Sequence, residues 1–231
     1  MLALDNITLH QDDWSLCADL TIGAGQHTAL IGPSGAGKST LLAAIAGLFP
    51  LESGRILWQG QDLAAQPTGK RPLSILFQDQ NLFPHLTIAQ NLGLGISPRL
   101  NLSAADRARI ETVLEATGLA GLGPRRPAEL SGGQQSRAAL ARALLRKRPL
   151  LLLDEAFSAL GPALKSEMLA LTRTLAAEHR FTLLMVTHDP EDAKAICPQT
   201  ILVADGSAEA PQDTGALLAD PPAALRAYLG C

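Results

Sequence analysis

The sequence predicts an α/β fold, and three observations support this prediction. Short apolar runs alternate with segments of helical periodicity along the chain. Two of the runs, PLLLLDE (149–155) and FTLLMVTHD (181–189), end in acidic or polar residues, which is typical of buried parallel strands. The glycine-rich turn GPSGAGKS (32–39) separates an apolar run from a helical segment, as expected at the junction of a strand and a helix.

The first part of the chain contains mostly predicted strands. Residues 2–31 predict short strands that end in HTALI, and residues 38–48 predict a helix. SGRILWQGQDL (53–63) indicates a strand with a turn, and LSILF (73–77) indicates another short strand. These elements predict the first half of the α/β body.

From about residue 79 to residue 141 the pattern changes to helical segments joined by Gly, Pro and Asn, which predicts a helical lobe set into the α/β body. After the strand in PLLLLDE, residues 162–180 have helical periodicity. The tail predicts a last strand and turn over 200–210 and a short helix around 222–230.

Composition limits the class of protein. With 231 residues the chain fits one domain, or one domain with an inserted lobe, and a net charge of -3 gives no case for nucleic-acid binding. The three cysteines show no metal-binding spacing, so we expect reduced thiols. The N-terminus lacks the pattern of a signal peptide, and the apolar stretch at 41–51 is too short to span a bilayer. We therefore expect any membrane role to be peripheral.

The turn GPSGAGKS fits the phosphate-loop pattern G-x-x-x-x-G-K-[ST] in its required context between a strand and a helix. Its glycines let backbone N–H groups surround phosphate oxygens. Lys38 can then reach the β and γ phosphates, and the Ser39 hydroxyl can bind Mg²⁺. At the end of the LLLLDE strand, Asp154 can hold Mg²⁺ and Glu155 can orient or deprotonate a water. Together these motifs predict nucleotide hydrolysis.

A second glycine-rich turn, LSGGQ (130–134), begins a predicted helix. Ser131 and Gln134 have the spacing of a capping box, which by itself explains only a helix start. Two successive glycines in a first turn each cost roughly 0.5–1 kcal/mol relative to alanine. Their presence therefore indicates that an anion approaches the backbone N–H groups.

LSGGQ, together with GPSGAGKS, LLLLDE and a histidine after a later strand, is the signature set of the ABC transporter ATPases, and the sequence resembles this family over nearly its whole length. The resemblance implies a P-loop NTPase (ABC ATPase) core with an antiparallel β subdomain and an inserted α-helical subdomain. The implied organisation is a single ABC ATPase domain over 1–231, with an α/β core at 1–78 and 142–231, a helical subdomain at about 79–141 and no C-terminal regulatory domain.

The resemblance also implies ATP and Mg²⁺ as cofactors and a homodimer with a second copy packed head to tail. Two permease subunits or domains, and indirectly a periplasmic substrate-binding protein, are the other implied partners, with no nucleic acid. The implied location is the cytoplasmic face of the bacterial inner membrane, where the protein would be peripheral.

Functional residues follow from the resemblance by position. Glu155, Gln78 and the switch histidine His188 would be catalytic, and Ser39, Gln78 and Asp154 would bind the metal. The residues that would contact ATP, the last four in the second copy's site, are Gly32, Pro33, Ser34, Gly35, Ala36, Gly37, Lys38, Ser39, Thr40, Trp14, Ser131, Gly132, Gly133 and Gln134. The family usually has an aromatic residue near the N-terminus that stacks on adenine, but here Gln11 occupies about that position. Trp14 is the nearest aromatic alternative. Trp14 could equally be a partly buried strand residue that does not contact adenine.

Within the family, the segment RPLSILFQDQNLFPHLTIAQNLGLG (71–95) most resembles importers of thiamine (vitamin B1). The alternatives are a subunit of another small-solute importer (polyamine, iron or molybdate) and a lipid or lipoprotein exporter. An ATPase of DNA repair or chromosome maintenance is disfavoured because the sequence lacks sustained heptads. A regulatory module that binds ATP without hydrolysing it is a further alternative, which Gly161 mildly favours.

Two departures from the family pattern stand out. Gly161 replaces the usual aspartate, which in the family helps to couple the two ATP sites, so coupling is expected to weaken while hydrolysis survives. Pro162 suits the first helical position, and glycine at an N-cap costs only a few tenths of a kcal/mol relative to a good cap. Ala156 replaces the usual proline after Glu155, which removes some local stiffness.

Overall fold

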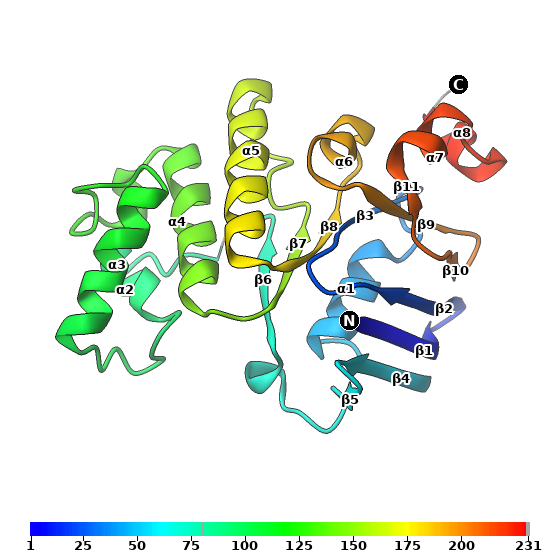
Figure 1. Cartoon of the computed structure of the whole chain (residues 1–231), viewed down its shortest axis with the longest axis horizontal. Coiled ribbons are helices and arrows are strands. Elements are labelled where there is room, and N and C mark those ends of the chain that lie inside the picture. The colour runs from blue at the N-terminus through cyan, green and yellow to red at the C-terminus, as the bar shows by residue number, and fades with distance from the viewer. Residues whose placement is uncertain (80, 230–231) are drawn as a thin grey trace.

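The computed structural model describes residues 1–79 and 81–229. In this part of the chain eleven strands form one sheet, in the order β5-β4-β1-β2-β10-β9-β3-β8-β7-β6 with β11 paired to β9 (Figure 1). The strands are β1 (Leu2–Gln11), β2 (Trp14–Ile22), β3 (His27–Ile31), β4 (Ser53–Trp58), β5 (Gln61–Asp62), β6 (Leu73–Phe77), β7 (Leu150–Asp154), β8 (Thr182–Val186), β9 (Gln199–Ala204), β10 (Ser207–Ala208) and β11 (Gln212–Asp213). The α-helices are α1 (Lys38–Ala46), α2 (Ile88–Gly93), α3 (Ala104–Ala116), α4 (Gly132–Leu145), α5 (Pro162–His179), α6 (Pro190–Ile196), α7 (Thr214–Ala219) and α8 (Ala223–Leu229), and the 3-10 turns are η1 (Thr68–Lys70) and η2 (Pro127–Glu129).

One half of the sheet is parallel. β3 lies between β8 and β9, and β7 lies between β8 and β6, all in parallel register. β8 is buried along its whole length, as the continuous apolar runs predict for strands covered on both faces. The predicted α/β fold is therefore confirmed.

The other half of the sheet is antiparallel. β1 pairs antiparallel with β2 on one side and with β4 on the other. β10 connects the two halves, since it pairs parallel with β2 and antiparallel with β9. Along β2 buried and exposed side chains alternate, because one face packs on the core and the other meets solvent. This half is the antiparallel β subdomain that the family resemblance implies.

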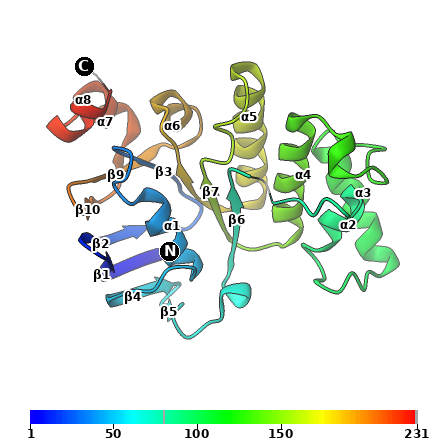
Figure 2. The same ribbon diagram turned by 180° about the vertical axis from the view of Figure 1, so that it is seen from behind.

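Helices α2, α3 and α4 form a group beside the sheet, at the left of Figure 1, and Figure 2 shows the same separation from behind. They share an apolar cluster of their own, whose buried members are Ile88, Leu92, Ile110, Leu114, Leu119, Leu130, Ala138, Ala141 and Leu145. Thr87 and Ser103 start α2 and α3 with capping boxes. The change of sequence pattern near residue 79 thus corresponds to a change from strands to packed helices.

The C-terminal part adds two short helices next to β9. α8 lies where the sequence predicts a helix, whereas α7 is not predicted, because its six residues are too few to show a period. Gly230, the last residue of the predicted tail helix, lies outside the described residues, and so does Cys231, the third cysteine.

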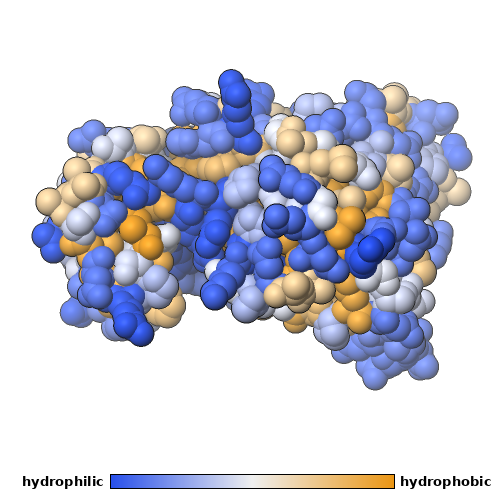
Figure 3. Space-filling view, turned by 60° about the horizontal axis from the view of Figure 1, so that its bottom comes forward, coloured by the Kyte–Doolittle hydropathy of each residue, from blue (hydrophilic) through white to orange (hydrophobic). Residues whose placement is uncertain are grey.

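No helix among the described residues has the length and apolar character needed to cross a bilayer. On the face shown in Figure 3, hydrophilic residues cover most of the surface and apolar residues gather in separate patches.

Candidate functional site

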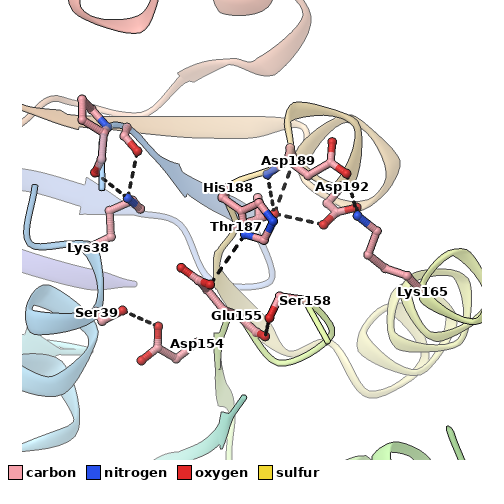
Figure 4. Close-up of polar contacts among 12 residues, drawn as sticks. Lys38, Ser39, Asp154, Glu155, Ser158, Lys165, Thr187, His188, Asp189 and Asp192 are labelled. Carbon is pink, nitrogen blue, oxygen red and sulfur yellow. Dashed lines mark hydrogen bonds and ion pairs between the residues drawn. The ribbon is translucent and has the colours of Figure 1, made fainter. Parts of the chain in front are cut away.

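The candidate site lies at the carboxyl edge of the parallel strands. In the sheet register Asp154 at the end of β7 is opposite Phe77 of β6 and Val186 of β8. Residues that follow these three strands must therefore lie close together, since parallel strands end at the same edge. Figure 4 shows Asp154, Glu155 and His188 at this edge, with Lys38 and Ser39 facing them from the start of α1.

The glycine-rich turn between β3 and α1 needs its glycines for steric reasons. Gly32, Gly35 and Gly37 have φ of 149°, 79° and 99°, which side chains rarely tolerate. A Cβ on Gly32 would lie 1.9 Å from the carbonyl oxygen of Val203. The backbone of the turn is thus free to curve around an anion at the N-terminus of α1.

Lys38 lies under this turn. Its Nζ donates hydrogen bonds of 2.8 Å to the carbonyl oxygens of Gly32 and Pro33. An ammonium group has three donors, so one remains for a phosphate oxygen. Burial lowers the pKa of Lys38, while the negative charges of Glu155 and Asp154 oppose that shift. The cation is therefore fixed by two carbonyls and held near two carboxylates.

Ser39 and Asp154 form the oxygen pair that the sequence predicts for the metal. The Ser39 hydroxyl donates a hydrogen bond of 2.6 Å to Asp154 Oδ1. Burial raises the pKa of Asp154, and Glu155 adds to this effect, while Ser39 and Lys38 oppose it. A bound cation would offset the cost of burying this carboxylate, and hydroxyl and carboxylate oxygens are ligands that Mg²⁺ accepts. The residues therefore fit the predicted metal.

Glu155 and His188 face each other across the same edge. Glu155 has a left-handed backbone (φ 48°), and its N–H donates to the carbonyl oxygen of Val186 at 3.2 Å. Its Oε2 lies 3.6 Å from His188 Nδ1. Strain of this kind in a residue other than glycine is frequent at functional sites. The pair is placed to share a proton or a water between a carboxylate and an imidazole.

A polar network that no sequence motif indicates supports the His188 loop. Lys165 Nζ from α5 lies 2.5 Å from Asp189 Oδ2 and 2.9 Å from Asp192 Oδ1, both on or next to α6. Thr187 donates to Asp192 Oδ2 at 3.0 Å and accepts from the Asp189 N–H at 3.1 Å. The residues on both sides of His188 are therefore tied to α5 and α6 (Figure 4).

Tyr228 of α8 makes a further contact with this loop. Its hydroxyl donates a hydrogen bond of 2.8 Å to the backbone carbonyl oxygen of His188. No motif could have indicated this contact, because it joins residues 40 positions apart that meet only through the packing of the last helix.

LSGGQ starts α4 as the capping box predicts. The Ser131 hydroxyl accepts from the Gln134 N–H at 3.3 Å, and Gln134 Oε1 accepts from the Ser131 N–H at 3.0 Å. A Cβ on Gly132 would meet nothing within 4 Å, whereas one on Gly133 would lie 2.6 Å from Leu164 Cδ2. Gly132 is therefore the open position of the turn, and Gly133 packs against α5.

The remaining predicted residues lie around the phosphate loop. Trp14 begins β2, and a Cβ on Gly37 would lie 2.2 Å from its Cζ2, so the indole ring packs directly on the loop. Gln78 is exposed and directly follows Phe77, the last residue of β6. Phe77 is the residue that lies opposite Asp154 in the register. Among the other loop residues, Ser34 and Gly35 are exposed, while Ala36 packs against the core.

The geometry defines a nucleotide-binding α/β ATPase, and a family model described as ABC transporter matches residues 17–158. The chain belongs to the ABC transporter family. It is 66% identical over 230 residues to the thiamine import ATP-binding protein ThiQ of Cereibacter sphaeroides, with 100% of both chains covered. It is 55% identical to the protein of the same name from Ruegeria sp. (strain TM1040), again with both chains covered completely.

A solved structure agrees with this assignment. The ATP-binding cassette MJ0796, solved as a dimer in a post-hydrolysis state bound to ADP and Pi, superposes with a TM-score of 0.78 at 30% identity. The match covers 93% of this chain and 99% of that one. ATP is thus the nucleotide that this fold implies, which agrees with the sequence prediction.

Proposed function

We propose that the protein is the ATP-binding subunit of an importer for thiamine, and that it hydrolyses ATP to drive uptake through a membrane permease. The match to ThiQ proteins over their whole length supports this substrate, because it includes segment 71–95 as well as the motifs that all ABC ATPases share. The site also contains groups that can transfer protons, since Glu155 and His188 lie beside each other at the edge of the sheet where the phosphate loop lies. These groups support hydrolysis of ATP over binding of ATP alone.

Each residue at the sheet edge has a defined task in this proposal. Lys38 and the backbone N–H groups of residues 32 and 34–40 would hold the phosphates, and Ser39, Asp154 and Gln78 would hold Mg²⁺. The bound metal would neutralise charge on the β and γ phosphates. Glu155 accepts a proton from the attacking water, and His188 stabilises charge that develops on the γ-phosphate. Trp14, which packs on the loop, is our candidate for contact with the adenosine part.

The separation of LSGGQ from the phosphate loop is the observation that supports a two-copy mechanism. In Figures 1 and 2, α5 and the strands β6–β8 lie between α4, which LSGGQ begins, and α1, which the phosphate loop begins. The turn has an open face at Gly132 and free N–H groups at the helix start. A second copy, packed head to tail, would place its Ser131, Gly132, Gly133 and Gln134 on the γ-phosphate of the first.

We also propose the domain organisation and the location that the family resemblance implies. Residues 79–141 would act as a helical subdomain that contacts the permease, and residues 1–78 and 142–231 as the core that binds ATP. The protein would then work at the cytoplasmic face of the inner membrane with two permease subunits or domains, supplied with thiamine by a periplasmic binding protein.

Uptake in cells tests this proposal. A bacterial strain without its own thiamine importer would receive this chain together with its cognate permease and binding protein, and uptake of labelled thiamine would be measured at low external concentration. We expect uptake with the wild-type chain and none with Glu155→Gln. Transport of a polyamine, iron or molybdate in place of thiamine would contradict the proposed substrate and leave the ATPase assignment intact.

A further inference from the structure

A basic cavity lies at the sheet edge opposite the candidate ATP site. It has a volume of about 510 Å³ and lies between α3, the end of α4 and the end of α5. Lys147, Arg148 and Pro149, which line it, precede β7, and His179 and Phe181 precede β8. Strands of five residues that rise ~3.3 Å per residue separate it from the ATP site by about 15 Å. The cavity is therefore distinct from that site.

Basic side chains from three separate elements line this cavity. Arg109 comes from α3, Lys147 and Arg148 come from the loop between α4 and β7, and His179 comes from the end of α5. Among the described residues that line the cavity, none is acidic. Val113, Leu144, Leu145, Pro149 and Phe181 give the rest of the lining an apolar character. The cavity thus combines a cationic part with an apolar part.

Helix capping explains only part of this arrangement. Basic residues after the last turn of α4 favour its dipole, and Arg109 lies 3.3 Å from Asp106 and 3.5 Å from the Leu145 carbonyl oxygen. In the part of the chain that the structure describes, Lys147 and Arg148 form no ion pair.

The basic residues in this loop also repel one another. Burial lowers the pKa of Arg146, and the charge of Arg148 lowers it further. Lys147 has a left-handed backbone (φ 50°), which residues other than glycine rarely adopt. An anion would relieve the repulsion.

We propose that this cavity binds a small organic phosphate, with the phosphate groups against Arg109, Lys147 and Arg148 and the apolar part of the ligand against Phe181. A volume of about 510 Å³ suits a molecule of drug-like or cofactor size. Guanidinium groups and a lysine ammonium are the side chains that bind phosphate most readily. In Figure 3, where the lower side of Figure 1 comes forward, hydrophilic residues cover the junction between the helices at the left and the rest of the molecule.

Calorimetric titration of the full-length protein tests this site. The ATP sites are first saturated with Mg²⁺ and a non-hydrolysable ATP analogue, so that added phosphates cannot bind there. Inorganic pyrophosphate then probes the cationic part, and thiamine diphosphate, a diphosphate with flat rings, probes both parts. We expect both to bind, thiamine diphosphate more tightly, with affinities that fall as salt is raised.

Two matched double variants identify the location. The charge reversal Lys147→Glu/Arg148→Glu should weaken binding by about tenfold or more, because it places two negative charges against the phosphate. The control Arg99→Glu/Arg107→Glu changes net charge equally at exposed positions that do not line the cavity and should bind as wild type does. Absence of binding once the ATP sites are filled, or equal weakening in both double variants, would overturn the proposal.

A lipid headgroup is the other source of the same phosphate chemistry. Sedimentation with phosphatidylcholine vesicles, with and without phosphatidylglycerol, separates the two. Retention by the anionic vesicles that the Lys147→Glu/Arg148→Glu variant loses, without binding of either soluble phosphate, would overturn the small-ligand proposal. Because both assays leave transport unmeasured, neither outcome depends on thiamine being the imported substrate.

Discussion

At the scale of single residues, Glu155 is the residue whose role as a proton acceptor can be removed most easily without a change in side-chain shape. Its carboxylate lies 3.6 Å from His188 Nδ1, and its backbone is held by Val186. Glu155→Gln keeps the volume but cannot accept a proton. We expect ATP turnover to fall about 100-fold or more, while ATP still binds and a dimer accumulates in size-exclusion chromatography. Glu178→Gln, at an exposed position of α5, should hydrolyse ATP normally. Full ATPase activity in Glu155→Gln would contradict the assignment.

Gly161 allows a test of the departure from the family pattern. It is the N-cap of α5 with an extended backbone (φ -63°, ψ 156°), and a Cβ there would meet nothing within 4 Å. Asp189 and Asp213 already cap α6 and α7 through their side chains. Gly161→Asp should therefore fold normally and be more stable by only a few tenths of a kcal/mol in urea unfolding.

The same variant should change how the two ATP sites cooperate. If the family aspartate couples the sites, Gly161→Asp should raise the Hill coefficient for ATP hydrolysis in the complex with the permease. Gly161→Asn supplies a comparable cap without the charge and is the matched control. An unchanged Hill coefficient in Gly161→Asp would mean that coupling in this protein does not use that position.

The sequence indicates which motif residues meet at the sheet edge, but not the contacts that support them. The sequence predicts that Ser39 and Asp154 bind the same metal, and Ser39 Oγ lies 2.6 Å from Asp154 Oδ1. This proximity can be predicted because one residue ends a parallel strand and the other follows the phosphate loop, at the same edge of the sheet. The contact of Tyr228 with His188 depends on how α8 packs, and the contact of Trp14 with Gly37 depends on the turn between β1 and β2. Neither is encoded in local spacing, since each joins residues that are distant in sequence.

At the scale of elements, the start of α4 separates a structural role from a functional one. A methyl group on Gly132 meets open space, and alanine has the better helix propensity, so Gly132→Ala should keep or slightly raise the stability of the fold. If LSGGQ contacts the nucleotide of a second copy, the same change should abolish ATP-driven dimer closure, measured by light scattering in a Glu155→Gln background. Closure that persists would mean that LSGGQ here only caps a helix.

Gly133 provides the contrasting substitution in the same turn. A Cβ there would lie 2.6 Å from the side chain of Leu164, so Gly133→Ala must displace that side chain. We expect Gly133→Ala to lower the free energy of unfolding by about 1–3 kcal/mol, which urea unfolding would measure. Comparison of the two alanine variants thus separates loss of function through the nucleotide from loss through packing.

Helix α8 is expected to position the catalytic loop through Tyr228. Burial raises the pKa of Tyr228, and the charges of Glu155 and Asp189 raise it further, so the hydroxyl stays a donor at neutral pH. Tyr228→Phe removes only the hydrogen bond to the His188 carbonyl oxygen. We expect kcat for ATP hydrolysis to fall a few-fold with KM unchanged. The effect should vanish in a His188→Ala background, and an equal loss there would mean that Tyr228 acts without His188.

At the scale of the whole molecule, the sequence predicts most of the elements in their order, except the short helices α6 and α7, but not how the parts are arranged. Alternating apolar runs and helical periods identified the parallel half of the sheet, because buried strands need continuous apolar residues. The curled sheet that joins the antiparallel β1, β2 and β4 to the parallel strands passes through β10, which is only two residues long. Such a short strand leaves no pattern in a sequence, so that only the family resemblance implied the antiparallel subdomain.

The head-to-tail dimer predicts that two inactive variants can complement each other when they are mixed. Lys38→Ala removes a phosphate ligand, and Gly132→Ala blocks the turn that should serve the other copy. In the complex with the permease, which keeps two copies together without ATP-driven closure, each variant alone gives pairs in which both ATP sites are defective. A mixed dimer places the intact phosphate loop of the Gly132→Ala chain against the intact LSGGQ of the Lys38→Ala chain, so one complete site is restored.

ATPase assays on the separate and mixed variants measure this complementation. With random pairing, half of the dimers are mixed, and each mixed dimer has one complete ATP site where a wild-type dimer has two. If the sites act independently, ATPase activity should therefore approach about a quarter of the wild-type value. If LSGGQ instead served the phosphate loop of its own chain, every site in the mixture would lack one part. Activity no higher than that of the separate variants would therefore contradict the head-to-tail arrangement. The chain that carries both substitutions should stay inactive on its own, because it restores no complete site in either arrangement.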